Sequence, residues 1–414
     1  MVTKVPKDED HPAGPPLLPA VPAGLRTVLD FVVSGKATSR AEIARRSGLV
    51  RTTVGKHVDH LVERGILREF EANESVRGRP PRVLALSPRA GTVAVADIDM
   101  LASRIAIADL SGRVLAQETV EIRADAGPEV VLDAVTERLL GLLVRNGHDP
   151  GRVREVVAGL PSPVDFERGC AVRPTGMPGW GSYPVAQELS DRFHAPAVVD
   201  NDANLMALGE ACQERADTPL LGIKISTGVG AGIVTAAGEV YRGADGAAGD
   251  IGHIRAVGGS DVQCACGNVG CLSAVASHRS VLHSLGIPET ADGDLLHGAR
   301  VLAERVAHND PPAVRALHQA ATEIGEVVAM LIYMFNPRTL VIGGPLSELR
   351  DNLLSGIRAV VYQRAQTLTT RDLTIIPTRL GESSGIHGAI ALATRDVFGP
   401  QGIARMLVDD PPDG

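Results

Sequence analysis

The hydrophobic and polar positions along residues 23–89 predict three short helices. In the first helix the apolar residues recur at the i, i+3, i+4 and i+7 spacing of one helix face. These residues are Leu25, Val28, Leu29 and Val32. Ser39, followed three residues later by Glu42, forms a capping box that opens a second helix. A third helix is expected over residues 51–64, and its inward positions are Val54, Val58, Leu61 and Val62.

Turn glycines and two strands complete this segment. Gly48 permits a tight turn between the second and third helices, and Gly65 stands where a C-terminal cap glycine belongs. Short strands are expected over residues 66–70 and 83–86. Three helices followed by a β-hairpin predict a winged helix-turn-helix domain over residues 23–89.

Beyond residue 93 the pattern changes to strands that alternate with longer helices. Strands are expected over residues 93–96, 104–110, 153–159, 197–199, 221–225 and 339–342. Helices are expected over residues 129–146, 205–212 and 320–335. A glycine-rich turn at residues 226–232 and the pair Gly343–Gly344 each follow a strand. This order predicts an α/β body in two lobes, with glycine turns where a nucleotide or a sugar can bind.

Charge separates the two parts of the chain. The whole chain carries a net charge of −8, but residues 23–89 carry +6 and residues 90–414 carry −13. A basic module joined to an acidic body is the charge distribution expected when one part of a protein binds nucleic acid.

The third helix and the hairpin loop supply the candidate DNA contacts. The exposed half of the helix is expected to enter the major groove, and the loop arginines suit the minor groove or phosphates. The candidates are Arg51, Thr52, Thr53, Lys56 and His57 on the helix, and Arg77 and Arg79 in the loop. The alternative is a small helical domain whose charged face is merely solvated.

One short segment has the composition of a metal site. His253, Cys264, Cys266 and Cys271 lie within nineteen residues, in a chain that has only five cysteines. One imidazole and three thiolates fill a tetrahedral zinc site, so the expected zinc ion is structural, one per chain. The alternative is three thiols that bind no metal.

The remaining bulk features bound the class of protein. With 414 residues the chain is long enough for two or three domains. No stretch reaches the roughly 18 apolar residues of a membrane span, and residues 1–22 contain six prolines without a signal-peptide pattern. We therefore expect a cytoplasmic protein with a disordered tail over residues 1–22 and a second tail over residues 399–414.

Four segments of the body together resemble the ROK family (repressor, open reading frame, kinase). They are Asp-Asn-Asp-Ala-Asn at 200–204, Ser-Thr-Gly-Val-Gly-Ala-Gly at 226–232, Gly-Asp-Ile-Gly-His at 249–253, and Cys-Ala-Cys-Gly-Asn-Val-Gly-Cys at 264–271. The resemblance implies a winged helix-turn-helix followed by a two-lobed, actin-like ATPase body. It implies a first lobe over residues 90–202, completed by a helix at 385–398, and a second lobe with the dimerisation surface over 203–384. It also implies that the zinc ligands are the four residues named above.

The phosphate-binding turn departs from the pattern of the family's kinases. There the family has Asp-x-Gly-Gly/Ala-Thr, whereas this chain has Asp97-Ile-Asp99-Met100-Leu101. A phosphate loop needs glycine and hydrogen-bond donors near the anion, and the Asp99 carboxylate would repel it. The second turn begins with Ser226 where the family has glycine. Kinase activity is therefore not expected, and no nucleotide-binding residues are assigned.

The sugar-binding residues implied by the resemblance are only partly present. Gly176 replaces an asparagine, Asp250 is shorter than the usual glutamate, and Ser273 replaces a second glutamate. The candidate ligand-binding residues are Asn201, Asp202, Asp250 and His253. Asp202 matches the family's catalytic base and is expected to be vestigial. It either binds a ligand hydroxyl or caps the helix that begins there.

These observations predict a DNA-binding transcriptional regulator of the ROK type, most simply a repressor, with a possible sugar or sugar-derivative effector. A homodimer or homotetramer bound to an inverted-repeat operator is expected, because one recognition helix rarely binds tightly enough alone. The two alternatives are an ATP-dependent sugar kinase and a ligand-silent DNA-binding dimer scaffold.

Overall fold

A computed structural model describes residues 18, 20–71, 82–214, 216–258, 261–291, 294, 296–348 and 350–408. The chain forms two compact units, one made of residues 91–395 and one made of the segments on either side of them. The N-terminal tail lies almost wholly outside the described residues. None of the described helices is both long enough and apolar enough to cross a membrane.

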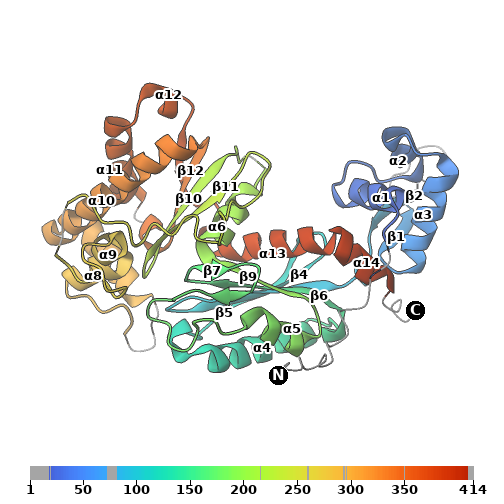
Figure 1. Ribbon diagram of the computed structural model, residues 1–414, viewed down its shortest axis with the longest axis horizontal. Coiled ribbons are helices and arrows are strands. Elements are labelled where there is room, and N and C mark those ends of the chain that lie inside the picture. The colour runs from blue at the N-terminus through green and yellow to red at the C-terminus, as the bar shows by residue number, and fades with distance from the viewer. Residues whose placement is uncertain are drawn as a thin grey trace, which may run out of the picture. The chain divides into compact units, whose positions relative to one another are not determined.

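The N-terminal part has the three helices and two strands expected from the sequence (Figure 1). They are α1 (Ala23–Val33), α2 (Arg40–Ser47), α3 (Arg51–Glu63), β1 (Leu67–Glu71) and β2 (Arg82–Leu86). The strands pair antiparallel, with Leu67 opposite Leu86. The Ser39 side chain accepts a hydrogen bond from the backbone N–H of Glu42 at 3.3 Å, and Gly48 adopts φ 73°. Ser39 and the turn glycine therefore act as predicted, while the Glu42 carboxylate accepts a hydrogen bond from the N–H of Thr38, one residue before the cap, at 3.4 Å.

A helix near the C-terminus belongs to the same unit. Helix α14 (Pro400–Val408) buries Ile403, Ala404 and Met406. Residues 399–414 were expected to form a tail, and this expectation is wrong for residues 400–408. Pro400 occupies the first position of the helix, where no backbone N–H is needed.

The first lobe of the body is built on a five-stranded sheet in the order β5-β4-β3-β6-β9. Strands β3, β6 and β9 are parallel, whereas β4 and β5 pair antiparallel at one edge. Helices α4 and α5 cover one face of the sheet and α13 runs along the other (Figure 1). The strands are β3 (Thr92–Asp97), β4 (Ser103–Asp109), β5 (Val114–Val120), β6 (Val153–Leu160) and β9 (Ala197–Asn201), with the short pair β7 (Val164–Asp165) and β8 (Cys170–Ala171). The helices are α4 (Pro128–Arg145), α5 (Val185–Phe193) and α13 (Ser384–Val397).

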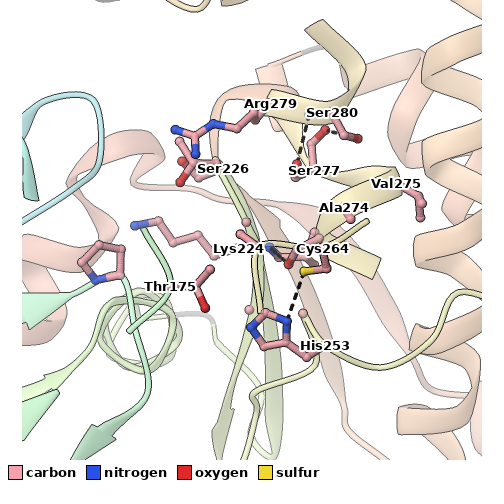
Figure 2. Close-up of a pocket in the computed structure, with 18 of the residues that line it drawn as sticks. Thr175, Lys224, Ser226, His253, Cys264, Ala274, Val275, Ser277, Arg279 and Ser280 are labelled. Atoms are coloured by element: carbon pink, nitrogen blue, oxygen red, sulfur yellow. Dashed lines mark hydrogen bonds between the residues drawn. The ribbon is translucent and has the colours of Figure 1, made fainter. Parts of the chain in front are cut away.

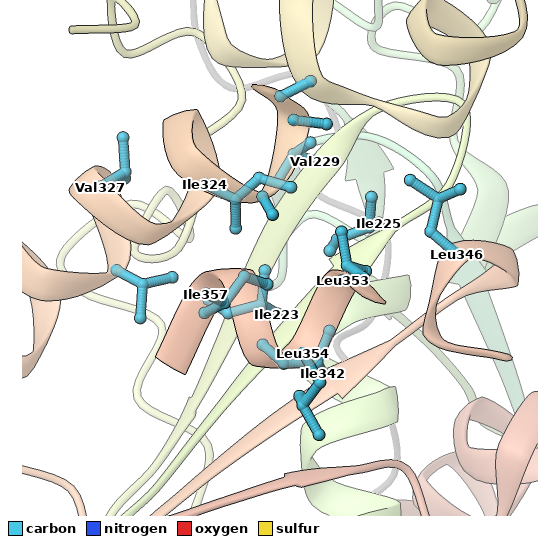
Figure 3. Packing of buried hydrophobic residues seen from close by; sticks show 14 of the residues in the cluster. Ile223, Ile225, Val229, Ile324, Val327, Ile342, Leu346, Leu353, Leu354 and Ile357 are labelled. Carbon is cyan, nitrogen blue, oxygen red and sulfur yellow. The ribbon is translucent and has the colours of Figure 1, made fainter. Parts of the chain in front are cut away.

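The second lobe is built on a four-stranded sheet in the order β11-β10-β12-β13. Its core packs the isoleucines of the central strands against two long helices, α10 and α11 (Figure 3). The strands are β10 (Leu220–Ile225), β11 (Val229–Val234), β12 (Thr339–Gly343) and β13 (Thr374–Pro377). The helices are α6 (Asp202–Ala211), α7 (Leu272–Ala276), α8 (His278–Ser284), α9 (His297–Ala307), α10 (Pro311–Phe335), α11 (Arg350–Arg364) and α12 (Thr367–Thr370).

The connections between strands and helices position the polar residues. Asp97 ends β3, Asn201 ends β9, and Asp202 begins α6. Parallel strands present their carboxyl ends at one edge of a sheet, which is where α/β proteins usually bind ligands. The side chains named in the sequence analysis therefore meet at this edge, next to the end of β10.

Candidate functional site

A cavity of about 690 Å³ lies in the body and is lined by both lobes. This volume is in the range of small-molecule sites. The first lobe contributes residues that include Asp99, Met100, Ser162, Thr175 and Asn201. The second lobe contributes residues that include Asp202, Lys224, Thr227, Asp250, His253, Ser273 and Arg279. Figure 2 shows His253 with Cys264 on one side of the cavity, and Ser277, Arg279 and Ser280 on another.

Asn201 and Asp202 have different roles at the start of α6. The Asn201 carbonyl oxygen accepts hydrogen bonds from the N–H groups of Ala203 at 2.9 Å and Asn204 at 3.2 Å. Its amide nitrogen donates to the carbonyl of Ser162 at 2.9 Å. The helix cap that was one interpretation of Asp202 is therefore made by Asn201.

Asp202 instead forms an ion pair with a residue that the sequence analysis did not single out. Lys224 Nζ lies 2.6 Å from Asp202 Oδ2 and 3.3 Å from Asp99 Oδ2. Burial alone would lower the pKa of Lys224, but Asp202, Asp97 and Asp99 outweigh it and raise this pKa above its usual range. Lys224 therefore stays protonated between the carboxylates. In Figure 2 its side chain extends from β10 toward the side where Thr175 of the first lobe lies.

Asp97 is the most enclosed carboxyl of this group. The residue is 5 % exposed, and its Oδ1 has no hydrogen-bond partner within the described part of the chain. Burial raises the pKa of Asp97 to about 6, and the nearby Lys224 opposes that rise.

A second ion pair supports the strand end that carries these residues. Arg242 donates from Nε and Nη2 to Asp200 Oδ2 at 3.0 and 2.6 Å, and its guanidinium lies 3.7 Å from the centre of the Phe166 ring. The other Asp200 oxygen accepts from the backbone of Asn201 and from the side chain of Asn204. Asp200 thus fixes the turn at Asn201 through these hydrogen bonds and its ion pair with Arg242.

The remaining residues considered for the sugar site differ in their burial and in their hydrogen bonds. Asp250 is exposed and His253 is partly buried, and both line the cavity. Ser273 accepts a hydrogen bond from the backbone N–H of Val229 at 2.9 Å, so it fixes the glycine-rich turn. Trp180 is fully buried and donates a hydrogen bond to the Ala124 carbonyl at 2.8 Å, so it belongs to the core of the first lobe.

Gly343 and Gly344, at the end of β12, have packing roles in this structure. A Cβ at Gly344 would lie 2.1 Å from the carbonyl oxygen of Ile225, and a Cβ at Gly343 would lie 2.4 Å from the sulfur of Met206. Close backbone packing and a φ of 92° account for Gly344, whereas a side chain at Gly343 would require the flexible end of Met206 to move.

The four candidate metal ligands meet at one point. The donor atoms of His253, Cys264, Cys266 and Cys271 all lie within 4.8 Å of one another. The distance from Cys264 Sγ to His253 Nδ1 is 3.7 Å, and the distance from Cys266 Sγ to Cys271 Sγ is also 3.7 Å. Tetrahedral zinc with bonds near 2.3 Å to sulfur separates its ligand atoms by about 3.7 Å. The cluster is therefore compatible with zinc.

The candidate DNA-binding face is the first half of α3. Arg51, Thr52 and Lys56 are exposed and Thr53 is half-buried. His57 is partly covered, because its ring lies against the position of Gly24 in α1, and burial lowers its pKa. Arg77 and Arg79 lie outside the described residues.

A DNA-binding module followed by an actin-like body in two lobes is the class that this fold defines. Over residues 97–396 the chain matches the ROK family, and it therefore belongs to the ROK family.

Two relatives and one solved structure are similar to this chain. The xylose repressor of Caldicellulosiruptor bescii is 26 % identical over 383 residues, covering 90 % of this chain and 95 % of that protein. The glucokinase of Halalkalibacterium halodurans is 32 % identical over 272 residues, covering 62 % of this chain and 80 % of that protein. A ROK family transcriptional regulator, a homologue of the Escherichia coli MLC protein, has a TM-score of 0.75 at 23 % identity, covering 93 % of this chain and 98 % of that one.

Proposed function

We propose that this protein is a DNA-binding transcriptional repressor of the ROK family that responds to an uncharged sugar. The observation that carries the proposal is that one chain joins a helix-turn-helix with an exposed basic helix to a ROK body whose phosphate turn holds a carboxylate. The similarity to a xylose repressor over almost the full length of both chains supports it. The glucokinase, by contrast, covers only 62 % of this chain.

DNA binding is assigned to the first half of α3. Arg51 and Lys56 are exposed, and neither forms an ion pair within the described residues. Arg40, by contrast, is held by Asp59 and Glu69. A homodimer or homotetramer on an inverted repeat places two such helices in successive major grooves. Arg77 and Arg79 are proposed to contact the minor groove or phosphates, and the protein is proposed to act in the cytoplasm.

The absence of kinase activity rests on the charge of the cleft. Phosphoryl transfer needs donors and cations around a triphosphate. Asp99 offers a carboxylate at this place, and the nearby Lys224 ammonium is already paired with two carboxylates. A neutral polyol, in contrast, can bind beside Asp202, Asp250 and His253 through hydrogen bonds to its hydroxyl groups.

The segment from His253 to Cys271, called the zinc knuckle below, is proposed to hold one structural zinc ion through His253, Cys264, Cys266 and Cys271. Zinc would keep the three thiols deprotonated and leave no ligand position for catalysis. Because His253 also lines the cavity, the zinc knuckle fixes the orientation of one wall of the ligand site.

The test is retention of genomic fragments by the full-length, zinc-loaded protein at physiological salt, followed by sequencing. Specific binding predicts enrichment of a few inverted repeats, and D-xylose or D-glucose is expected to release them. The Arg51→Ala/Lys56→Ala variant should lose this enrichment, while Arg138→Ala, on the exposed side of helix α4 in the body, should keep it. Uniform retention that collapses as salt rises would contradict the proposal, because it indicates phosphate attraction alone.

The same experiment separates the two other candidate functions. Enrichment that no sugar alters indicates a ligand-silent scaffold, for which the engagement of Asp202 by Lys224 is the supporting observation. Turnover of ATP with a hexose, measured in a coupled assay, would instead indicate a kinase.

A further inference from the structure

Three carboxylates converge at the edge where the two lobes meet. Asp97 and Asp99 come from the end of β3 and the turn after it, and Asp202 comes from the first turn of α6. Their exposed fractions are 5 %, 8 % and 8 %. Three buried carboxylates in one place repel each other strongly unless a cation neutralises them.

The cation in this structure is part of the chain. Lys224 leaves β10 and brings its ammonium group within 2.6 Å of Asp202 and 3.3 Å of Asp99. The Lys224 side chain is itself only 14 % exposed. Because Asp99 belongs to the first lobe and Lys224 to the central strand of the second, this ion pair also ties the lobes together.

This arrangement differs from a phosphoryl-transfer site in the cation that lies between the carboxylates. Such a site leaves room for a metal ion that arrives with the nucleotide and neutralises the phosphates. Here a tethered ammonium group occupies the position between the carboxylates. A phosphate that approached this position would meet the Asp99 carboxylate, and a divalent cation would have to displace Lys224.

We infer that Lys224 is a built-in counter-cation that makes ligand binding in this cavity independent of nucleotide and divalent metal. The cavity then favours uncharged polyols, because Lys224 is already neutralised by Asp202 and Asp99, and Arg279, which also lines the cavity, is paired with Glu289. Lys224 also positions Asp202 for a ligand hydroxyl by holding its Oδ2 atom. The part of this inference that concerns the ligand rests on the proposed function. The charge balance between Lys224 and the three carboxylates does not, and it can be tested without any ligand.

The first experiment measures sugar affinity by calorimetry with full-length protein. D-xylose and D-glucose are the uncharged probes, and D-glucose 6-phosphate is the charged one. The wild type should bind an uncharged sugar with the same affinity with and without MgATP, and should bind the phosphate more weakly. Lys224→Met should weaken the sugar about ten- to hundredfold, the range for a lost hydrogen bond to a charged group. Lys36→Met, on an exposed residue of the other unit, should leave affinity unchanged.

The second experiment needs no ligand and uses Mn²⁺ and Ca²⁺ as probes of the carboxylates. In Lys224→Met the three carboxylates are free to bind a divalent cation, so the melting temperature should rise by several degrees when either ion is added. The wild type and Lys36→Met should show no such rise. The double variant Asp99→Asn/Lys224→Met removes one carboxylate together with the lysine, so it should fold more stably than Lys224→Met and lose most of the response.

The two experiments fail in different ways. If no sugar binds to the wild type, the ligand part of the proposed function is wrong, and the divalent-ion response then decides the role of Lys224. If wild-type sugar binding requires MgATP, the inference is overturned. It is also overturned if Lys224→Met melts like the wild type with and without Mn²⁺, because Lys224 is then not the cation on which the carboxylates depend.

Discussion

At the scale of single residues, burial of charged groups in the cleft affects the stability of the body. Asp97 illustrates this best, because burial holds its pKa near 6 although Lys224 lies close by. A carboxyl whose pKa is raised by folding binds its proton more tightly in the folded state, so its ionisation opposes folding. The cleft therefore retains a group that reduces the stability of the fold at neutral pH.

Asp97→Asn is expected to raise the free energy of unfolding at pH 7. The gain should be about 2–3 kcal/mol, the equivalent of two pKa units. The stabilisation from the protonated carboxyl is fully present below pH 3.8 and is lost as the pH rises toward about 6. The measurement is urea unfolding of the wild type and the variant between pH 4.5 and pH 7.5. A difference that does not change with pH in this window would contradict the assignment to Asp97.

At the scale of elements, two helices cross at a pair of glycines. In α6 a Cβ at Gly209 would lie 2.0 Å from the carbonyl oxygen of Ser384, and in α13 a Cβ at Gly388 would lie 1.8 Å from that of Leu205. Helix α13 lies along the first lobe and α6 packs on the second-lobe sheet. The glycines therefore let the backbones of two helices touch where the lobes join.

Gly209→Ala is expected to destabilise the body by about 1–3 kcal/mol, because the methyl group forces the helices apart. The matched control is Gly141→Ala in α4, where the added Cβ would meet only the flexible end of Arg145. That control should be neutral or stabilising by up to about 1 kcal/mol, since alanine is the better helix former. Equal melting temperatures for Gly209→Ala and the wild type would show that the helices do not touch there.

The zinc knuckle is a second element whose local sequence sets its structure. Cys271→Ser should abolish zinc binding and lower the melting temperature, because the site's free energy of metal binding contributes to folding. Cys212→Ser is the control, since this exposed cysteine lies outside the cluster. Zinc content by mass spectrometry and thermal unfolding are measured together. Full zinc content in Cys271→Ser would remove this residue from the ligand set.

At the scale of the whole molecule, the two units differ in composition and in how the chain builds them. The chain's only strongly basic segment is the N-terminal one, and the chain returns to this unit through α14 after completing the body. The DNA-binding unit therefore depends on two separate parts of the sequence, whereas the body is one continuous segment in which α13 returns to the first lobe.

Ending the chain at Gly399 is expected to destabilise the DNA-binding unit while leaving the body folded. The deletion removes Ile403 and Met406, and burial of such a side chain contributes about 1.5–3 kcal/mol. Ending the chain at Val408 is the control and should have no effect. Limited proteolysis and operator binding measure the outcome. Undiminished operator binding by the shorter chain would show that α14 does not support the DNA-binding unit.

The sequence by itself determined the local features of this protein. Capping by Ser39, the turns at Gly48 and Gly65, the apolar faces of α1 and α3, and the four clustered metal ligands all follow from residues close together in the chain. Short-range geometry fixes such features, because helix periodicity and ligand spacing need no knowledge of the rest of the fold.

Only the tertiary structure decided the chemistry of the cleft. Lys224 and Asp99 are 125 residues apart and meet because the end of β3 in the first-lobe sheet lies next to the end of β10 in the second-lobe sheet. The sequence alone showed an acidic residue in a phosphate turn but not the lysine that neutralises it. It likewise predicted a tail at residues 399–414, because the apolar face of α14 becomes recognisable only when Ile403 and Met406 are buried in the N-terminal unit. Long-range contacts depend on strand order and packing, and local patterns do not encode them.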